Sequence, residues 1–528
     1  MTDGFSSEDR KKVTFGTFLT VIGGIFLASF KAMGFVLRAV FGGVNYGLFA
    51  IAQNLTEMLA YFLVGGFNDA IVYLGAKNLE GREAAKHGDQ DAPTVTNEEG
   101  LYRTLATCIG VPLAFSVAIV VLVQLLLPVL YDTWWSSHDE LLLQLVRVLI
   151  VTLPFLLLCQ LPTEALKIFL DFRWQVGVVQ VFVPTATVVY GLSFYFLLGM
   201  GVEALAWALL AATMTGAPIA LYGFSRHFSV TRTVGHFFRL KFDREVLDFA
   251  IPQSLNMMLN LGMVRLDSLM LSGFVSANAV GIYSLISDLT QLIRLAKMAF
   301  SSVFSPLVAR YQAQNNRQGI RDALHTLVRF TSALSIPLLI IMMVMYPHFV
   351  LSPDEAWTDG RVFPWLLAIG PMMSCFFGLA GNLLLMTGHA RLLLLNSVVC
   401  GILNLVLNLL FIPRFGLLGA ALATGISNFA ISFMQIVEMG YYEKLTMPPR
   451  LYAWIMAAAA LPLAAAAFVF TDAGQAVVAM LPGQTLFTQS AVYTGLAIAF
   501  YVAILFLPPG GFHKAPLEWI RRRKAEAA

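Results

Sequence analysis

The chain has 528 residues, of which 58% are hydrophobic and only 12% are charged, and its formal net charge is +3. Soluble proteins are roughly 45–50% apolar and about 25% charged. The composition therefore excludes a cytosolic enzyme, a disordered chain and a nucleic-acid binder, and it predicts a membrane protein.

Fourteen segments are apolar enough to cross a bilayer, which requires about 20 predominantly apolar residues per helix. We expect an all-α polytopic membrane protein with about fourteen transmembrane helices. In chain order the predicted spans are residues 14–37, 44–75, 102–131, 142–165, 175–198, 202–224, 247–273, 277–308, 325–351, 363–387, 391–412, 415–440, 450–471 and 488–508.

The basic residues predict the orientation of these spans, because Lys and Arg favour cytoplasmic loops. If the N-terminal tail is cytoplasmic, most of the 34 basic residues fall in cytoplasmic segments, and the outer connections hold only Arg38, Arg361 and Arg414. We therefore expect both termini in the cytoplasm. The polar segment 76–100 is expected to be a mobile cytoplasmic loop.

Two pairs of segments predict an internal repeat. Residues 44–59 align with 278–293 at an offset of 234 positions, which places Gly47 opposite Gly281. Residues 196–210 align with 411–425 in the same order. A repeat of six helices is parallel, and such transporters place the substrate between the two halves. The alternative is that apolar segments align by chance.

The repeat predicts four regions of the chain. An N-terminal six-helix bundle spans 1–224, a cytoplasmic linker spans 225–246, and a C-terminal six-helix bundle spans 247–440. Two additional helices and a basic cytoplasmic tail complete the chain over 441–528.

Five basic residues remain inside the predicted spans. Charges at membrane depth are costly and usually face a bundle interior or a wet cavity. The repeat offset also places Lys31 opposite Arg265. We therefore predict a net positive cavity that attracts an anionic headgroup such as a phosphate. The predicted headgroup-binding residues are Arg294, Lys297, Arg265, Lys31 and Arg147.

The polar residues of the second and eighth spans complete this prediction. Five of them are expected to line the cavity or to couple an ion: Glu57, Asp288, Asp267, Asn54 and Gln291. The cations also have simpler interpretations than headgroup binding. Lys31 and Arg147 could extend to the outer interface, and Arg265 could have a structural partner. Arg294 and Lys297 could instead pair with Asp288 or Glu57.

No catalytic, metal or disulfide site is expected. The four cysteines, Cys108, Cys159, Cys375 and Cys400, lie in apolar runs and form no CxxC pattern, so they are expected to be buried free thiols. The eight histidines have no metal-ligand spacing. No phosphate-binding loop for ATP is present.

Two stretches carry a family resemblance. LNLVLNLLFIPRFGLLGAALATGISN (403–428) and DSLMLSGFVSANAVGIYSLISDL (267–289) resemble the Wzx-type polysaccharide flippases of the multidrug/oligosaccharidyl-lipid/polysaccharide exporter superfamily. Asn404, Asn408 and Asn428, within the first stretch, are interpreted as hydrogen-bonding helix-packing residues.

The resemblance implies a flippase that moves an undecaprenyl-pyrophosphate-linked oligosaccharide across the bacterial cytoplasmic membrane by alternating access. The exported product would be a surface polysaccharide, such as an exopolysaccharide or O-antigen. Its implied partners are this lipid-linked substrate, membrane lipids, a polysaccharide polymerase and chain-length machinery. No cofactor is implied beyond coupling to an H⁺ or Na⁺ gradient.

Three other functions are compatible with parts of the sequence. A murein lipid-precursor flippase would also have fourteen helices. A multidrug or cation antiporter of the same superfamily would need an acidic cavity, whereas the charges at membrane depth are mainly basic. A membrane polysaccharide polymerase or ligase would need a larger outer loop with acid and base residues.

Overall fold

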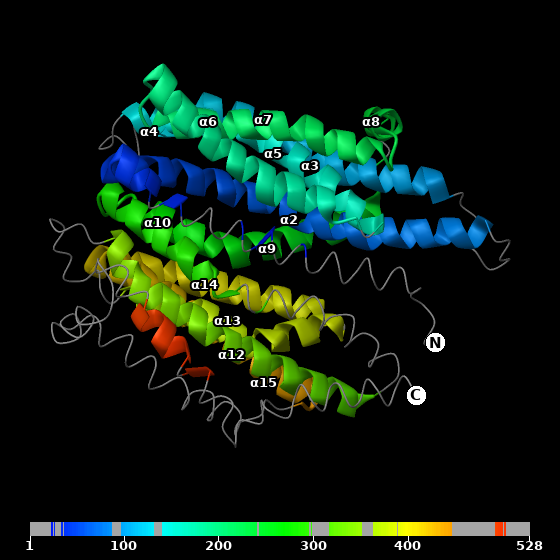
Figure 1. Cartoon of the computed structure of the whole chain (residues 1–528). Helices are drawn as coiled ribbons and strands as arrows, with labels where there is room; N and C mark the ends of the chain where they lie inside the picture. Colours follow the sequence, from blue (N-terminus) through cyan, green and yellow to red (C-terminus); the bar gives the residue numbers. More distant parts are fainter. Residues whose placement is uncertain are drawn as a thin grey trace. The chain divides into compact units, whose positions relative to one another are not determined.

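The computed structural model of the chain consists of helices joined by short connections in the part that it describes (Figure 1). The described residues are 36–86, 97–130, 140–169, 171–239, 242–294, 297, 316–350, 363–387, 389–445, 492–499 and 501–502, with single positions at 19, 23, 24, 26, 33 and 34. They include no β-strand. The expected all-α fold is confirmed.

Within these ranges, seven helices are long and apolar enough to cross a membrane. They correspond to predicted spans between 44 and 440. The predicted span 450–471 lies outside the described residues, and 14–37 and 488–508 do so for the most part. The protein is therefore a multi-pass membrane protein, and the total of fourteen helices stays a prediction.

The chain divides into two compact units, residues 1–285 and 286–528. The predicted bundle boundaries at 224 and 247 stay a prediction. The first unit contains α2 (Gly43–Lys86), α3 (Asn97–Leu130), α4 (Glu140–Ile150), α5 (Thr152–Ala165), η2 (Leu166–Phe169), η3 (Gln175–Phe182), α6 (Val183–Leu198), α7 (Glu203–Ser225), α8 (Val230–Phe238), α9 (Arg244–Leu271) and most of α10 (Ala277–Gln291).

Helix α2 is the central element of the first unit. It packs along α9 and also contacts α3 and α5 (Figure 1). Glycines permit the close approach to α9: a Cβ atom on Gly66 would lie 2.0 Å from the carbonyl oxygen of Ala250. Small residues commonly allow membrane helices to approach in this way. Gly66 therefore serves close packing with α9.

The N-terminal end of α2 meets the N-terminal end of α10 through two glycines. A Cβ on Gly47 would lie 1.8 Å from the Ala277 carbonyl oxygen, and a Cβ on Gly281 would lie 2.9 Å from Gly47 Cα. Gly47 and Gly281 are the residues that the repeat aligns. The pseudo-two-fold axis that the repeat implies stays a prediction.

Polar connections between the spans are more helical than expected. Helix α2 continues to Lys86 and α3 begins at Asn97, so the ends of the expected loop 76–100 are helical. The sequence GAKNLEGREAAK at the end of α2 is rich in Ala, Glu, Lys and Leu, which favour helix even in water. The predicted linker likewise contains the short helix α8, capped by the Ser229 side chain.

Large apolar side chains cover the outward faces of several helices. Leu125 of α3 is 71% exposed, and Leu197 of α6 is 80% exposed. Such surface would be unfavourable in water and is expected where helices face lipid. This exposure agrees with the membrane assignment.

The second unit contains α12 (Arg317–Val350), α13 (Phe363–Met386), α14 (Ala390–Phe415), α15 (Leu417–Glu438) and η5 (Met439–Glu443). Helix α15 packs against both α13 and α14. Asn404 Nδ2 donates to Thr424 Oγ1 at 3.2 Å, which joins α14 to α15. Asn408 Nδ2 donates to Asn404 Oδ1 at 3.1 Å. The interpretation as a helix-packing residue is confirmed for Asn404, whereas this hydrogen bond of Asn408 lies within α14.

Candidate functional site

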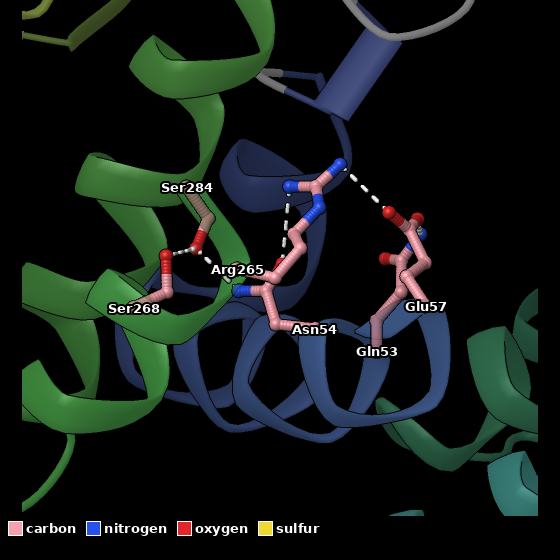
Figure 2. Close-up of polar contacts among 6 residues, drawn as sticks. All are labelled: Gln53, Asn54, Glu57, Arg265, Ser268 and Ser284. Atoms are coloured by element: carbon pink, nitrogen blue, oxygen red, sulfur yellow. Dashed lines mark hydrogen bonds and ion pairs between the residues drawn. The ribbon is translucent and has the colours of Figure 1, made fainter. Parts of the chain in front are cut away.

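Three helices of the first unit bring six polar side chains into one connected network (Figure 2). Residues three or four apart share a helix face, so α2 presents Gln53, Asn54 and Glu57 together. Helix α9 contributes Arg265 and Ser268, and α10 contributes Ser284. Figure 2 shows the Arg265 guanidinium between Asn54 and Glu57.

Arg265 is the centre of this network. Its Nη2 lies 2.7 Å from Glu57 Oε2, and its Nη1 donates to Asn54 Oδ1 at 3.1 Å. The Glu57 carboxylate also accepts from Gln53 Nε2 at 2.9 Å. These contacts join α2 to α9 at a point where both helices carry a charge.

Asn54 extends the network to α10. Its Nδ2 donates to Ser284 Oγ at 2.8 Å, and Ser284 Oγ lies 3.3 Å from Ser268 Oγ. Asn54 thus uses its amide oxygen for Arg265 and its amide nitrogen for Ser284. One side chain couples the positions of all three helices.

Burial makes the Arg265–Glu57 pair energetically important. Arg265 is 4% exposed, whereas the Glu57 side chain is 28% exposed. A buried guanidinium is tolerated because a carboxylate and an amide oxygen satisfy it. The sequence left open whether Arg265 binds a headgroup or has a structural partner. The structure gives it a structural partner, Glu57. An anionic ligand at Arg265 would compete with Glu57.

Asp267 occupies a different environment from Arg265. It is fully buried and accepts a hydrogen bond from Tyr283 Oη at 3.1 Å, which joins α9 to α10. Residues two apart point to different helix faces, so Asp267 and Arg265 have separate partners. The proposed role of Asp267 in ion coupling stays a prediction.

The second unit holds two further predicted headgroup-binding cations, Arg294 and Lys297. Arg294 Nη2 donates to Asn428 Oδ1 of α15 at 3.2 Å, and Lys297 Nζ donates to Ser374 Oγ of α13 at 3.3 Å. Cys375 Sγ contacts the Ile293 carbonyl oxygen at 3.2 Å. The two cations thus contact polar groups on α13 and α15.

Lys297 has no carboxylate within ion-pair distance among the residues that the structure describes; the side-chain contact found there is the neutral hydroxyl of Ser374. Its side chain is half-buried. An ammonium group removed from water without a counter-charge creates a strong local positive potential. That potential favours an incoming anion.

The other predicted residues lie elsewhere or are only partly defined. Asp288 and Gln291 are half-buried on α10. Arg147 is exposed on α4 and lines a separate groove. Lys31 lies outside the described residues. The proposed roles of all these residues in headgroup binding and ion coupling stay predictions.

Three polar residues that the sequence did not assign to a site contact these cations or belong to the Arg265 network. They are Ser268, Ser374 and Asn428. Asn428 was interpreted as a packing residue, and it does donate to the Thr424 carbonyl oxygen at 2.9 Å. Small polar residues within apolar spans were the available signal, but spacing along one helix cannot identify a partner on another.

Comparison with known proteins identifies the family. A model of the polysaccharide biosynthesis protein family matches residues 14–312, more than half of the chain. The chain belongs to this family. A second model, MatE, matches residues 252–410. The resemblance to the polysaccharide flippase branch of the multidrug/oligosaccharidyl-lipid/polysaccharide exporter superfamily is therefore confirmed.

Individual relatives agree with this membership of the polysaccharide biosynthesis protein family. The probable low-salt glycan biosynthesis flippase Agl15 of Haloferax volcanii is 24% identical over 168 residues, which is 32% of this chain. The alignment spans about a third of that relative, 35% of its length.

Two solved structures have the same fold. Lipid II flippase MurJ, in an inward closed conformation, superposes with a TM-score of 0.64 at 14% identity, covering 93% of this chain and 99% of its own. An inward-facing multidrug resistance MATE family transporter gives a TM-score of 0.56 at 16% identity, covering 84% and 97%.

Proposed function

We propose that the protein is a flippase, and not an enzyme, that moves an undecaprenyl-pyrophosphate-linked oligosaccharide across the bacterial cytoplasmic membrane by alternating access. The product would serve export of a surface polysaccharide. Membership of the polysaccharide biosynthesis protein family supports this proposal. So does the glycan biosynthesis flippase among its relatives.

The observation that carries the proposal is the half-buried ammonium of Lys297, whose contact in the described second unit is the Ser374 hydroxyl. Arg294 lies three residues away on the same segment, bonded to the Asn428 amide. Two cations about one helical turn apart present a concentrated positive charge. A pyrophosphate carries the matching negative charge, and neutral hydrogen-bond partners can be displaced by it at low cost.

The first unit would supply the conformational restraint. Arg265, Asn54 and Ser284 hold α2, α9 and α10 together. A change in this network would alter the relative free energies of two arrangements of these helices, as alternating access requires.

Reconstituted proteoliposomes provide the test. A fluorescent polyprenyl-pyrophosphate oligosaccharide is incorporated, and its movement between leaflets is followed by quenching from the outside. We expect Lys297→Ala and Arg294→Ala to slow movement by at least about tenfold, since each loses a charge-assisted contact. Arg391→Ala, which removes an exposed cation of the same unit, is the matched control.

The outcomes separate the alternatives. Wild-type rates in both cation variants would contradict the proposed headgroup role. Movement of lipid II but not of the oligosaccharide lipid would favour a murein-precursor flippase, a function that the MurJ fold makes reasonable. Movement of an organic cation against a proton gradient, with neither lipid moved, would favour a multidrug antiporter.

A further inference from the structure

The short helix α8, between α7 and α9, is anchored against the N-terminal part of α3. The Ser229 backbone N–H donates to Tyr102 Oη at 3.1 Å, and the His236 ring stacks on the Tyr102 ring with centroids 6.3 Å apart. The Phe237 ring lies over Gly110, where an added Cβ would come within 2.1 Å of it. Both ends of α8 are thus held on α3, and its rotation about its own axis is fixed.

Helix α8 runs across the direction of the membrane-spanning helices. Figure 1 shows α8 nearly end-on, whereas α3 and α7 run across the picture. Its contacts on α3 lie at Tyr102 and Gly110, within about three turns of the start of the span Glu99–Leu126. A helix with that direction and depth lies in the membrane interface, along the bilayer surface.

The contacts with α3 also decide which side of α8 is directed toward the bilayer interior. Tyr102, near the start of the span, is contacted by His236 and by Arg232, whose guanidinium carbon lies 5.8 Å from the ring centroid. Gly110, about two turns deeper along α3, is contacted by Phe237. The side of α8 with Arg232 and His236 therefore faces the end of the span, and the opposite side faces the bilayer interior.

That opposite side of α8 is apolar and uncovered. Val234 and Phe238 are four residues apart and share one face of the helix. At 3.6 residues per turn, the midpoint of this face lies about 160° around the helix from the midpoint of Arg232 and His236. Val234 is 46% exposed and Phe238 is 76% exposed. A phenyl ring so exposed is unfavourable in water and is stabilised among acyl chains.

The same segment carries positive charge and no negative charge. Residues 226–239 contain Arg226, Arg232 and Arg239 and no Asp or Glu, and all three arginines are exposed. The predicted topology places them at the cytoplasmic leaflet, whose anionic lipids attract basic segments. A guanidinium also matches the geometry of a phosphate group.

We propose that α8 is an interfacial helix that binds anionic phospholipid of the phosphatidylglycerol class. Val234 and Phe238 insert among the acyl chains, while Arg232 and Arg239 hold headgroup phosphates. Net charge selects the lipid, because a cationic segment without carboxylates gains more from an anionic headgroup than from the net-neutral phosphatidylcholine. The positive-inside rule accounts for the arginines but not for the exposed apolar face beside them. This site is independent of the proposed flippase activity.

Quenching by brominated lipids tests the proposal in proteoliposomes of the full-length protein. Bimane is attached at Phe238→Cys; the four native cysteines are buried, so background labelling should be low. The bilayer contains equal amounts of phosphatidylcholine and phosphatidylglycerol, with bromine on the acyl chains of one or the other. We expect both to quench, and phosphatidylglycerol to quench at least about twofold more strongly, since each arginine near the surface favours anionic lipid by a factor of about five.

Charge variants and salt separate lipid selectivity from insertion. Labelled Phe238→Cys carrying Arg232→Gln and Arg239→Gln should still be quenched but should lose the preference for phosphatidylglycerol. Arg317→Gln, which removes an exposed cation of the second unit, should keep the preference. High salt should reduce the preference without any change of arginine, because it screens exposed charges.

A second labelling position controls for ordinary contact with lipid. Phe196 of α6 is 72% exposed and lies just before the start of α7, whereas α8 follows the end of α7. Bimane at Phe196→Cys should be quenched equally by the two lipids, because it lies far from the arginines of α8.

Three results would overturn the proposal. Absence of quenching at Phe238→Cys by either lipid would show that α8 lies in water. Equal quenching by the two lipids there, with all arginines present, would remove the anionic-lipid site. A preference that survives both high salt and the two Arg→Gln changes would assign the lipid to groups outside α8.

Discussion

At the residue scale, two cations that the sequence predicted on the same grounds have different environments. Arg265 is paired with Glu57 and with Asn54. Lys297 contacts a neutral hydroxyl among the described residues. The first arrangement neutralises a buried charge, whereas the second leaves a positive potential. Because the two differ in what an anion would gain by binding, Lys297 is the stronger headgroup candidate.

The unequal burial of Arg265 and Glu57 makes a specific prediction about stability. Glu57→Gln leaves a guanidinium of 4% exposure without its counter-charge, and we expect destabilisation of about 3–5 kcal/mol. Arg265→Gln leaves a carboxylate that is 28% exposed and partly hydrated, so its cost should be smaller.

Melting temperatures of the purified variants in detergent measure the difference. The double variant Glu57→Gln with Arg265→Gln should melt closer to Arg265→Gln than to Glu57→Gln, because neither charge of the pair remains. Glu99→Gln, an exposed carboxylate on α3, controls for net charge. If the two single variants have equal melting temperatures and their effects add in the double variant, the pair is not coupled as described.

At the element scale, the crossing of α2 and α10 depends on the absence of side chains. Gly47 and Gly281 bring two backbones together without intervening atoms. The network of Asn54 and Ser284 begins about two turns further along α2 from Gly47. Close backbone approach at the glycines is what allows these short polar side chains to bridge the same two helices.

A methyl group at either glycine should disturb this crossing. At Gly47 a Cβ would lie 1.8 Å from a backbone oxygen, so the helices must separate. We expect Gly47→Ala to lower stability by about 1–3 kcal/mol, the usual cost of overpacking, despite the better helix propensity of Ala.

Gly235→Ala on α8 is the matched control, because a Cβ there meets no atom within 4 Å. It should leave the melting temperature unchanged or raise it slightly. Cross-linking of Cys residues introduced near the crossing would report separation of α2 from α10. A Gly47→Ala protein as stable as wild type would show that the crossing tolerates a side chain.

At the scale of the whole molecule, the distribution of charge matters more than its net value of +3. Basic residues concentrate in segments that the positive-inside rule assigns to the cytoplasm. The apolar faces of α3, α6, α14 and α15 carry the exposed hydrophobic side chains that lipid requires. These two patterns, one along the chain and one around each helix, define a multi-pass membrane protein.

The predicted orientation can be tested with two introduced cysteines. Gly201→Cys lies in the connection before α7, predicted outside, and His227→Cys lies in the connection after α7, predicted inside; both positions are exposed. A membrane-impermeant maleimide should label Gly201→Cys in intact cells and label His227→Cys only after permeabilisation. The four native cysteines are buried, so the background should be low. The reverse labelling pattern would invert the topology.

The sequence by itself determined the class of this protein. Apolar composition, the positions of seven of the predicted spans between 44 and 440 and the family motif near residues 403–428 depend on local sequence, because membrane insertion is decided segment by segment. The candidate headgroup-binding cations could be found in the same way, since each is an exception within an apolar run.

Only the tertiary structure decided which polar side chains meet. Glu57 and Arg265 are more than 200 positions apart, and their contact depends on the rotation and crossing of α2 and α9. Helical periodicity restricts a residue to one face of its helix but does not name the helix opposite. Arg265 is neutralised by a carboxylate, whereas Lys297 contacts a hydroxyl. This difference comes from packing between helices and cannot be read from the sequence of one span.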